Sequence, residues 1–444
     1  METRIAPEDR IERAGTVIPH FDNFDTPGEV RLVETEGLVE ALGCVPVFTE
    51  AMRIRSPSAS HLLTGGLRER LATQLEEGGC SLCIVDGALT PVQQRNLERD
   101  LGVKVIDRTG LILEIFGLRA RTKEGRLQVE LARLLYERSR LVRTWTHLER
   151  QRGGSGFLSG PGETQLEADR RMLDDAIRRL KEQLEDVKRT RRLQRAGRQR
   201  RGVPVVALVG YTNAGKSTLF NRLTGADVFA RDMPFATLDP TIRAMELPHG
   251  REAALVDTVG FITDLPVHLV ESFQATLEEV LDADLLVHVR DRSSVEDDAQ
   301  KADVMKVLHG LEEDADQPLP PMIEAWNKAD LLDADTRETF ALSAERSDPP
   351  GVLVSAVTGK GVGALLSRIE ANLIGRADTL ELDLPPADGQ ARAWLHEHGD
   401  VLEETVGEDG AFRIRVRLDA RSRGVFSAAH PDILPPEPSA DDFL

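Results

Sequence analysis

The sequence has few aromatic residues and no long apolar run, and each shortage narrows the class of protein. Aromatic residues make up 4% of the 444 positions, which disfavours a surface that binds nucleic acid by stacking bases on aromatic rings. No segment approaches the roughly eighteen consecutive apolar residues of a membrane span. The segment from Met1 to Gly15 is rich in charge and lacks the apolar core of a secretory signal. We therefore expect a cytoplasmic protein without a membrane span.

Cysteine is also scarce, with three residues in the chain. An odd and small number disfavours a disulfide framework. Cys80 and Cys83 have the CxxC spacing, but no second ligand pair or histidine cluster accompanies them. Two packed thiols in a strand are therefore the simpler interpretation than a metal site.

The formal net charge of −19 disfavours general binding to polyanions. One segment departs from this average, because Lys188 to Arg201 carries eight lysine and arginine residues and no acidic residue. Such a basic arm can direct contact with phosphate groups through one surface, or it can simply keep a helix solvated. The sequence leaves both interpretations open.

Length and pattern predict several domains. Residues 28 to 110 alternate helical and apolar strand patterns, which predicts a small parallel sheet. Two long helical patterns, at 122–151 and 164–195, flank a glycine-rich break at 153–162 and predict an antiparallel helical hairpin. Strands and helices alternate again after Val203, and a small α+β pattern ends the chain. The expected domains are residues 1–118, 119–200, 203–375 and 378–444.

The segment GYTNAGKS matches the phosphate-binding pattern GxxxxGK[ST], between an apolar strand and the start of a helix. Backbone N–H groups and the helix N-terminus bind phosphate, Lys216 reaches the outer phosphates, and Ser217 supplies a hydroxyl to Mg²⁺. This context predicts a nucleotide site. The residues of this segment that we expect around the nucleotide are Gly210, Tyr211, Thr212, Asn213, Ala214, Gly215, Lys216, Ser217 and Thr218.

The tetrapeptide DTVG follows an apolar stretch about forty residues after Lys216. An aspartate at such a strand end can hold Mg²⁺, often through water, and a glycine lets the backbone approach a γ-phosphate. By itself the tetrapeptide is also compatible with an ordinary strand-to-turn exit. Its predicted site residues are Asp257, Thr258, Val259 and Gly260.

Two downstream segments indicate that the base is guanine. The aspartate of the segment NKAD can accept the ring N–H and the exocyclic amine of guanine, a pair of donors that adenine does not present. The segment SAV would complete the base pocket through the backbone of Ala356. A polar helix cap is the alternative for the first segment. The residues concerned are Asn327, Lys328, Asp330, Ser355, Ala356 and Val357.

The segment FATLDPT lies between the phosphate-binding helix and Asp257. A threonine here can bind Mg²⁺ while GTP is present and release it after hydrolysis. We choose Thr237 over Thr241, and a plain loop threonine is the alternative. The expected nucleotide contacts are Phe235, Ala236, Thr237, Leu238 and Asp239.

Together these motifs predict an α/β fold, in which a P-loop GTPase domain follows a small parallel α/β domain with a helical hairpin and precedes a small α+β domain. The expected reaction converts GTP to GDP and phosphate. Its catalytic residues would be Lys216, Thr237 and Gly260, and its Mg²⁺ ligands Ser217, Thr237 and Asp257. Phe261 stands where many GTPases carry a water-orienting glutamine, so we expect slow intrinsic hydrolysis that a partner accelerates.

The order of these motifs resembles the HflX family of translation-associated GTPases. The resemblance extends to Asp107-Arg108-Thr109, to RARTKEGRLQ from Arg119 and to GPGETQLEADRR from Gly160, the most specific of the three. It covers roughly residues 20 to 375. Ser159 is a departure, because the family usually carries arginine before GPGE.

This resemblance implies a GTPase that binds the large ribosomal subunit and its rRNA and splits or rescues ribosomes. The helical region and the N-terminal domain are the parts implied to touch the ribosome. We expect a monomer that associates with ribosomes or with a membrane surface. Asn213 resembles an asparagine that binds K⁺ in related GTPases, although it can equally cap its own turn; equal hydrolysis rates in potassium and sodium buffers would exclude the ion.

Two other functions stay open. One is a nucleotide-dependent enzyme that remodels RNA away from ribosomes, with ATP bound in the N-terminal domain. The other is a GTP-regulated switch that binds a protein partner. No second P-loop motif supports the first, and partner affinity that is independent of GTP would favour a simple binding protein.

Overall fold

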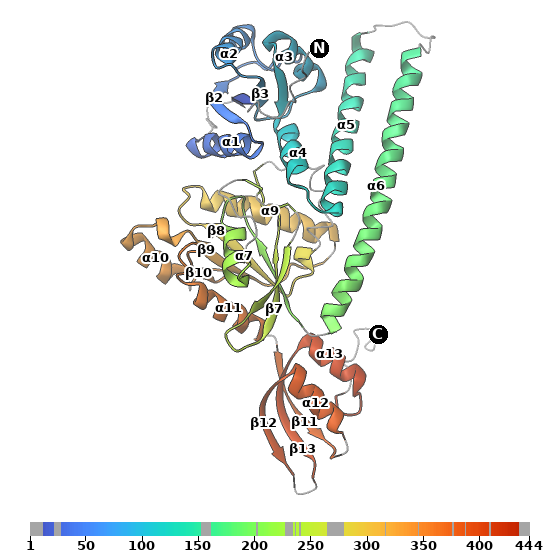
Figure 1. Ribbon diagram of the computed structural model, residues 1–444, viewed down its shortest axis with the longest axis vertical. Helices are drawn as coiled ribbons and strands as arrows, with labels where there is room; N and C mark the ends of the chain where they lie inside the picture. The colour runs from blue at the N-terminus through green and yellow to red at the C-terminus, as the bar shows by residue number, and fades with distance from the viewer. Residues whose placement is uncertain are drawn as a thin grey trace, which may run out of the picture.

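The computed structural model describes residues 12–21, 28–151, 161–200, 203–226, 234–235, 237–238, 241–263, 279–315, 317–344, 346–374, 377–386, 388–407 and 410–434. Its strands form three sheets, which we call the N-terminal, central and C-terminal modules, and a long helical hairpin lies beside them (Figure 1). Most of the predicted glycine-rich loop lies outside the described residues, as do the predicted nucleotide contacts Ala236 and Asp239.

The N-terminal module is a four-stranded parallel sheet in the order β2-β1-β3-β4, which confirms the predicted parallel α/β pattern. Its strands are β1 (Arg13–His20), β2 (Val45–Arg53), β3 (Leu82–Val85) and β4 (Lys104–Asp107), and its helices are α1 (Glu29–Ala41), α2 (Gly65–Glu77), α3 (Pro91–Leu101) and α4 (Arg108–Arg119). Strand β1 and helix α4 were not predicted. The buried run Ala14–Ile18 makes β1 a central strand, and the three cysteines are buried and free.

The helical hairpin consists of α5 (Lys123–Gln151) and α6 (Pro161–Arg200). The two helices pack through Leu131, Leu135, Ile177 and Leu184. Helix α6 is longer than predicted at both ends. Proline is tolerated in a first helical turn, where its missing N–H has no partner to lose. At 1.5 Å per residue, the 40 residues of α6 span about 60 Å.

The central module is a six-stranded sheet in the order β10-β9-β8-β5-β7-β6, in which only β6 runs antiparallel among these described strands. Its strands are β5 (Val205–Val209), β6 (Thr241–Glu246), β7 (Glu252–Asp257), β8 (Leu285–Asp291), β9 (Met322–Asn327) and β10 (Gly351–Leu353). Its helices are α7 (Lys216–Thr224), α9 (Asp297–Ala315), η1 (Ala329–Leu331), α10 (Ala334–Ala344) and α11 (Val362–Ile374). Because β5, β7, β8 and β9 are parallel, their carboxyl ends meet at one edge, where the motif loops begin.

The C-terminal module is a three-stranded antiparallel sheet in the order β11-β13-β12. Its strands are β11 (Ala377–Leu384), β12 (Asp400–Val406) and β13 (Phe412–Asp419), and its helices are α12 (Gly389–His398) and α13 (Ala420–Ala429). Apolar side chains of the sheet and of both helices form its core. This confirms the predicted α+β pattern, although helix α13 was not predicted.

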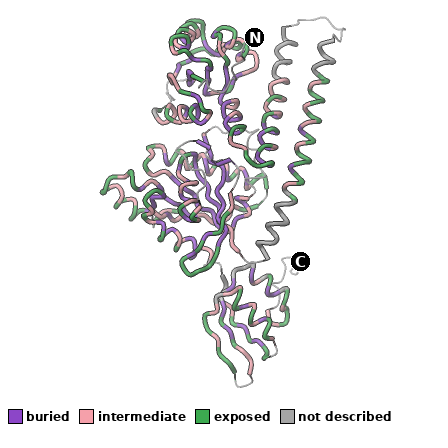
Figure 2. Tube along the Cα trace, viewed as in Figure 1, coloured by how far each residue is buried: buried purple, intermediate pink, exposed green. Residues whose placement is uncertain are grey.

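One buried apolar cluster continues from the N-terminal module into the central module. It contains Ile112 and Phe116 of α4 together with Phe235, Leu238 and Phe261 of the central module. Figure 2 shows buried chain where the two modules meet, and exposed chain along much of the described part of α6. Among the described residues, no helix is both long and apolar enough to cross a membrane.

Candidate nucleotide site

The loop between β5 and α7 requires glycine at two positions. Gly210 has φ +149° and Gly215 has φ +93°, a range that side chains rarely adopt. A Cβ atom on Gly210 would stand 2.3 Å from the carbonyl oxygen of Val289, and one on Gly215 would stand 2.3 Å from Nδ2 of Asn327. The loop can therefore run this close to Val289 and Asn327 only with glycine at these two positions.

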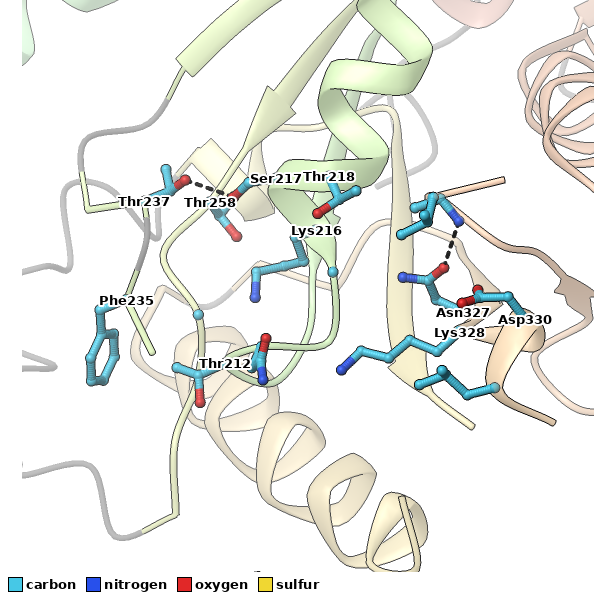
Figure 3. A pocket seen from close by; sticks show the side chains of 16 residues that line it. Thr212, Lys216, Ser217, Thr218, Phe235, Thr237, Thr258, Asn327, Lys328 and Asp330 are labelled. Atoms are coloured by element: carbon cyan, nitrogen blue, oxygen red, sulfur yellow. Dashed lines mark hydrogen bonds between the residues drawn. The ribbon is translucent and has the colours of Figure 1, made fainter. Parts of the chain in front are cut away.

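Lys216 begins helix α7, and its amine lies in the middle of the site (Figure 3). Its Nζ donates to the carbonyl oxygens of Gly210 and Tyr211, over 2.9 and 2.8 Å. Burial lowers the pKa of Lys216 to about 8, and the nearby Asp257 carboxylate opposes that shift. A bound phosphate would favour the charged amine in the same way as a carboxylate does.

Ser217, Thr237 and Asp257 come together from three segments of the chain. The hydroxyl oxygens of Ser217 and Thr237 are 2.8 Å apart, and each hydroxyl lies 2.8 Å from Oδ2 of Asp257. The carboxylate is buried, and its Oδ1 has no hydrogen-bond partner. Burial raises the pKa of Asp257, whereas Lys216 and the two hydroxyls lower it.

This set of oxygen atoms fits Mg²⁺. The ion prefers oxygen ligands and few protein contacts, and a buried carboxylate oxygen without a partner is a group that a cation would satisfy. In the described part of the chain, no group of three histidine, cysteine or acidic residues offers another arrangement for a metal. Thr241, the threonine that we did not choose, instead begins β6.

The other side of the site is built by Asn327, Asp330 and the loop after β10. The side chain of Asn327 donates to the carbonyl oxygen of Ala214 over 2.8 Å and accepts from the N–H of Ala356 over 3.0 Å. Ser355 donates from its Oγ to Oδ1 of Asp330 over 2.5 Å. These bonds join the loop between β5 and α7 to the segments predicted to bind the base, and they fix the direction of the Asp330 carboxylate.

A pocket of about 330 Å³ separates these two sides. The predicted residues that line it are Thr212, Asn213, Gly215, Lys216, Ser217, Thr218, Phe235, Thr237, Thr258, Gly260, Asn327, Lys328, Asp330, Ala356 and Val357. Figure 3 shows Phe235 and Thr237 on one side of Lys216, and Asn327 and Asp330 on the other.

Seven predicted residues lie behind the pocket wall rather than on it: Gly210, Tyr211, Ala214, Leu238, Asp257, Val259 and Ser355. Leu238 and Val259 belong to the apolar cluster shared with the N-terminal module. Asp257 reaches the site through the two hydroxyls that it binds. The side chain of Tyr211 takes a different course, because its hydroxyl contacts Glu34 of the N-terminal module.

Two residues of the site were not foreseen. Leu331 follows Asp330 and lines the pocket although its side chain is largely exposed. Arg222 of α7 donates from Nε to the carbonyl oxygen of Ala356 over 3.1 Å and also contacts that of Val357. It therefore holds the loop that the sequence predicts to bind the base. The position of Leu331 directly after the NKAD motif could have indicated that this residue lines the pocket. No local sequence pattern indicates the role of Arg222.

The segment from Gly260 to Phe261 lies directly against the phosphate loop. Phe261 accepts from the N–H of Thr212 over 2.6 Å and donates to the carbonyl oxygen of Gly210 over 3.1 Å. A Cβ atom on Gly260 would stand 2.8 Å from Cγ2 of Thr212 and 3.1 Å from Nζ of Lys216. The side chain of Phe261 is 2% exposed and packs in the shared apolar cluster, so it does not orient water.

A loop of this geometry before a helix, a carboxylate with two hydroxyls, and a base side built on Asn327 and Asp330 define a P-loop GTPase. Comparison with family models agrees. A model described as a 50S ribosome-binding GTPase matches residues 205–328. Models described as the N-terminal and middle regions of a GTP-binding GTPase match residues 29–117 and 119–198, and one described as the HflX C-terminal domain matches residues 342–425.

The chain belongs to the HflX family of GTPases. It is 51% identical to GTPase HflX of Magnetococcus marinus over 81% of this chain and 82% of that protein. It is 43% identical to GTPase HflX of Escherichia coli over 87% of this chain and 89% of that protein. A crystal structure of SsGBP with GDP matches 81% of this chain and 97% of that one, at 25% identity and a TM-score of 0.49. The protein accordingly binds GTP and hydrolyses it.

Proposed function

We propose that this GTPase binds the large ribosomal subunit through its rRNA in the GTP state and splits or rescues ribosomes. The observation that carries the proposal is the position of Thr237, 2.8 Å from both Ser217 and Asp257. A threonine held there by Mg²⁺ and GTP can leave after hydrolysis, which makes the surrounding surface depend on the nucleotide. The family model described as a 50S ribosome-binding GTPase supports the choice of partner.

The helical hairpin supports a large and extended partner. Helices α5 and α6 contribute 29 and 40 residues, and only one strip of apolar side chains joins them in the described part of the hairpin. Much of the described surface of α6 is exposed (Figure 2). A hairpin of this length can reach along a surface much larger than that of an ordinary protein partner.

Hydrolysis would depend on Mg²⁺ held by Ser217, Thr237 and Asp257, which stabilises charge on the phosphates. Lys216 would bind the outer phosphates, and the backbone of Gly260 would approach the γ-phosphate. Because Phe261 is buried in the apolar cluster, another group must orient the attacking water. We therefore propose slow intrinsic hydrolysis that the ribosomal subunit accelerates. The exposed Asn213, with φ 62° at the pocket wall, is the residue that would hold K⁺.

Co-sedimentation with purified large subunits tests the proposal, in a non-hydrolysable GTP analogue and in GDP across a salt series. We expect pelleting in the analogue, weakened by salt because phosphate contacts release counterions. The variant Thr237→Ala should lose the difference between the two nucleotides while the protein still binds GDP. Equal pelleting in both nucleotides would contradict GTP gating, and no pelleting at low salt would contradict the ribosomal partner.

A further inference from the structure

A buried arginine of the N-terminal module bonds to the segment of the central module that follows Gly260. Arg108 begins α4 and is 4% exposed. It donates from Nη1 to Asp86 over 2.6 Å and from Nη2 to Glu34 over 2.7 Å, both within its own module. The same Nη2 donates to the carbonyl oxygen of Thr263 over 2.9 Å. Thr263 lies three positions after Gly260, so Arg108 holds the segment that is predicted to approach the γ-phosphate.

Tyr211 completes the same network from the phosphate loop. Its hydroxyl contacts Glu34, lies 2.7 Å from Oγ1 of Thr263 and accepts from the N–H of Thr263 over 3.0 Å. Burial and the Glu34 carboxylate raise the pKa of Tyr211, so the phenol stays protonated and can donate to Glu34. Glu34 thus joins Arg108 to Tyr211. The phosphate loop therefore contacts Glu34 directly through Tyr211, and the segment after Gly260 is linked to Glu34 through Arg108 and Tyr211.

A second contact between the modules is apolar and joins α4 to the segment that carries Thr237. The ring of Phe116 in α4 meets the ring of Phe235 edge-on, with centroids 4.7 Å apart. Gly37 of α1 lies beside Pro234, because a Cβ atom there would stand 3.4 Å from the proline ring. Both rings of the aromatic pair are buried. Phe235 is two positions from Thr237, so packing on α4 restricts where Thr237 can lie.

We infer that the N-terminal module holds two segments close to the phosphate loop, the one that carries Gly260 and Thr263 and the one that carries Phe235 and Thr237. Docking of the N-terminal module would therefore favour bound GTP over bound GDP. In this structure the docked module coexists with Thr237 drawn to Ser217 and Asp257 and with Phe261 bonded to the phosphate loop. Glu34, Arg108 and Phe116 are positioning residues, because they act on the site through Tyr211, Thr263 and Phe235.

Thermodynamic linkage gives this inference a second consequence. If docking favours GTP, then GTP must favour docking by the same factor. Couplings between two sites in one protein are typically about 5- to 150-fold. The nucleotide would therefore set the placement of the N-terminal module, independently of which partner that module meets. This coupling requires GTP binding but no ribosome. The coupling can therefore be absent while ribosome binding is confirmed, and ribosome binding can be absent while the coupling is confirmed.

The variant Glu34→Gln tests the inference in the full-length protein. It keeps the size of the side chain and leaves the pair between Arg108 and Asp86, so the N-terminal module should fold. We expect the affinity for a fluorescent non-hydrolysable GTP analogue to fall about 10-fold, and that for fluorescent GDP to change less than about 2-fold. Arg68→Ala is the matched control, because its ion pair with Asp100 lies within the N-terminal module. It should change neither affinity.

Three further measurements separate a positioning role from general damage to the fold. Tyr211→Phe removes only the hydroxyl, which contacts both Glu34 and Thr263, so the double variant should lose less GTP-analogue affinity than the sum of the two single effects. In the wild type, backbone hydrogen exchange in α1 and α4 should be slower with the GTP analogue than with GDP. In Glu34→Gln, the exchange rates with the two nucleotides should be equal. Gly37→Trp, which pushes α1 away from Pro234, should also lower analogue affinity selectively. Equal losses for both nucleotides, additive single effects or exchange that ignores the nucleotide would each overturn the inference.

Discussion

The two sides of the nucleotide pocket are supported differently. On the base side, Asn327 bonds to Ala214 and Ala356, Ser355 bonds to Asp330, and Arg222 holds the last loop. Every one of these residues belongs to the central module. On the phosphate side, Tyr211, Phe235 and Thr263 are each held by a residue of the N-terminal module. The base side is therefore self-supported, whereas the phosphate side depends on how two modules dock.

This difference matches the chemistry of a nucleotide switch. GTP and GDP share the base, so a rigid base side binds both and discriminates neither. The two nucleotides differ only in the γ-phosphate, so a sensor must lie on the phosphate side. Because residues of the N-terminal module contact the phosphate side, a shift of the segments around the γ-phosphate would also shift the N-terminal module. Substitutions on the base side should therefore alter both affinities together.

The largest expected effect is on the base side, for Asp330→Asn. The carboxylate would accept two N–H groups of guanine, and each hydrogen bond to a charged group is worth about 1.5–3 kcal/mol. Affinity for GTP and GDP should fall on the order of 100- to 10,000-fold in parallel. An amide in place of the carboxylate can donate to a carbonyl, so xanthosine diphosphate should bind better than to the wild type. Competition binding with both diphosphates measures this, and unchanged preference for guanine would remove Asp330 from base recognition.

A smaller effect is expected for Arg222→Ala, also on the base side. The variant loses the donors to Ala356 and Val357, which together are worth about 1.5 kcal/mol. Affinity for GDP and for a GTP analogue should fall about 10-fold, by the same factor for each. Arg243→Ala is a suitable control, because Arg243 is exposed on the edge strand β6 and its described bond is to its neighbour Ile242. A loss confined to one nucleotide would show that Arg222 also serves the phosphate side.

How much of this could be predicted from the sequence differs between the two sides. Apart from Arg222, the base-side contacts lie in or beside motifs, since Asn327 ends the apolar strand β9 and Asp330 and Ser355 come shortly after apolar strands. The ends of helix α3 are also set by local residues, because Thr90 and Gln93 form a capping box and Gly102 ends the helix with φ +69°. Such signals involve residues close together in the chain, so they can be recognised in the sequence alone.

The remaining features depend on packing between distant segments. Arg108 and Thr263 are 155 positions apart, and nothing near Arg108 indicates which carbonyl group it meets. Strand β1 was missed because its short run, with glycine and proline within it, has no alternation. Its place in the middle of the sheet comes from tertiary packing: the ring of Phe48 covers Gly15, where a Cβ atom would stand 2.4 Å from the ring.

The smallest expected effect concerns the sheet that both sides share. His288 of β8 is buried, and burial lowers its pKa to about 4 from 6.5, with Glu324 opposing the shift. The unfolded chain therefore binds a proton below pH 6.5 that the folded chain does not, so stability falls as the pH drops from 6.5 towards 4. Between pH 7 and pH 5.5 the loss should be about 1 kcal/mol.

The variant His288→Gln should lose about 1 kcal/mol less than the parent protein over the same pH interval. Urea unfolding, followed by the fluorescence of Trp326 after the other tryptophans are replaced by phenylalanine, measures this difference. Because His288 does not line the pocket, the ratio of GTP-analogue to GDP affinity should be the same in both proteins at pH 7. An equal pH response of the two proteins would mean that His288 is not held neutral in the fold.

The most direct measurement compares two variants on opposite sides of the pocket. Affinities for GDP and for a non-hydrolysable GTP analogue are measured for the wild type, Arg222→Ala and Glu34→Gln under one set of conditions. We predict that Arg222→Ala weakens both nucleotides equally and that Glu34→Gln weakens the analogue selectively. If Glu34→Gln weakens both equally or neither, the phosphate side is as self-supported as the base side, and the contrast between them is wrong.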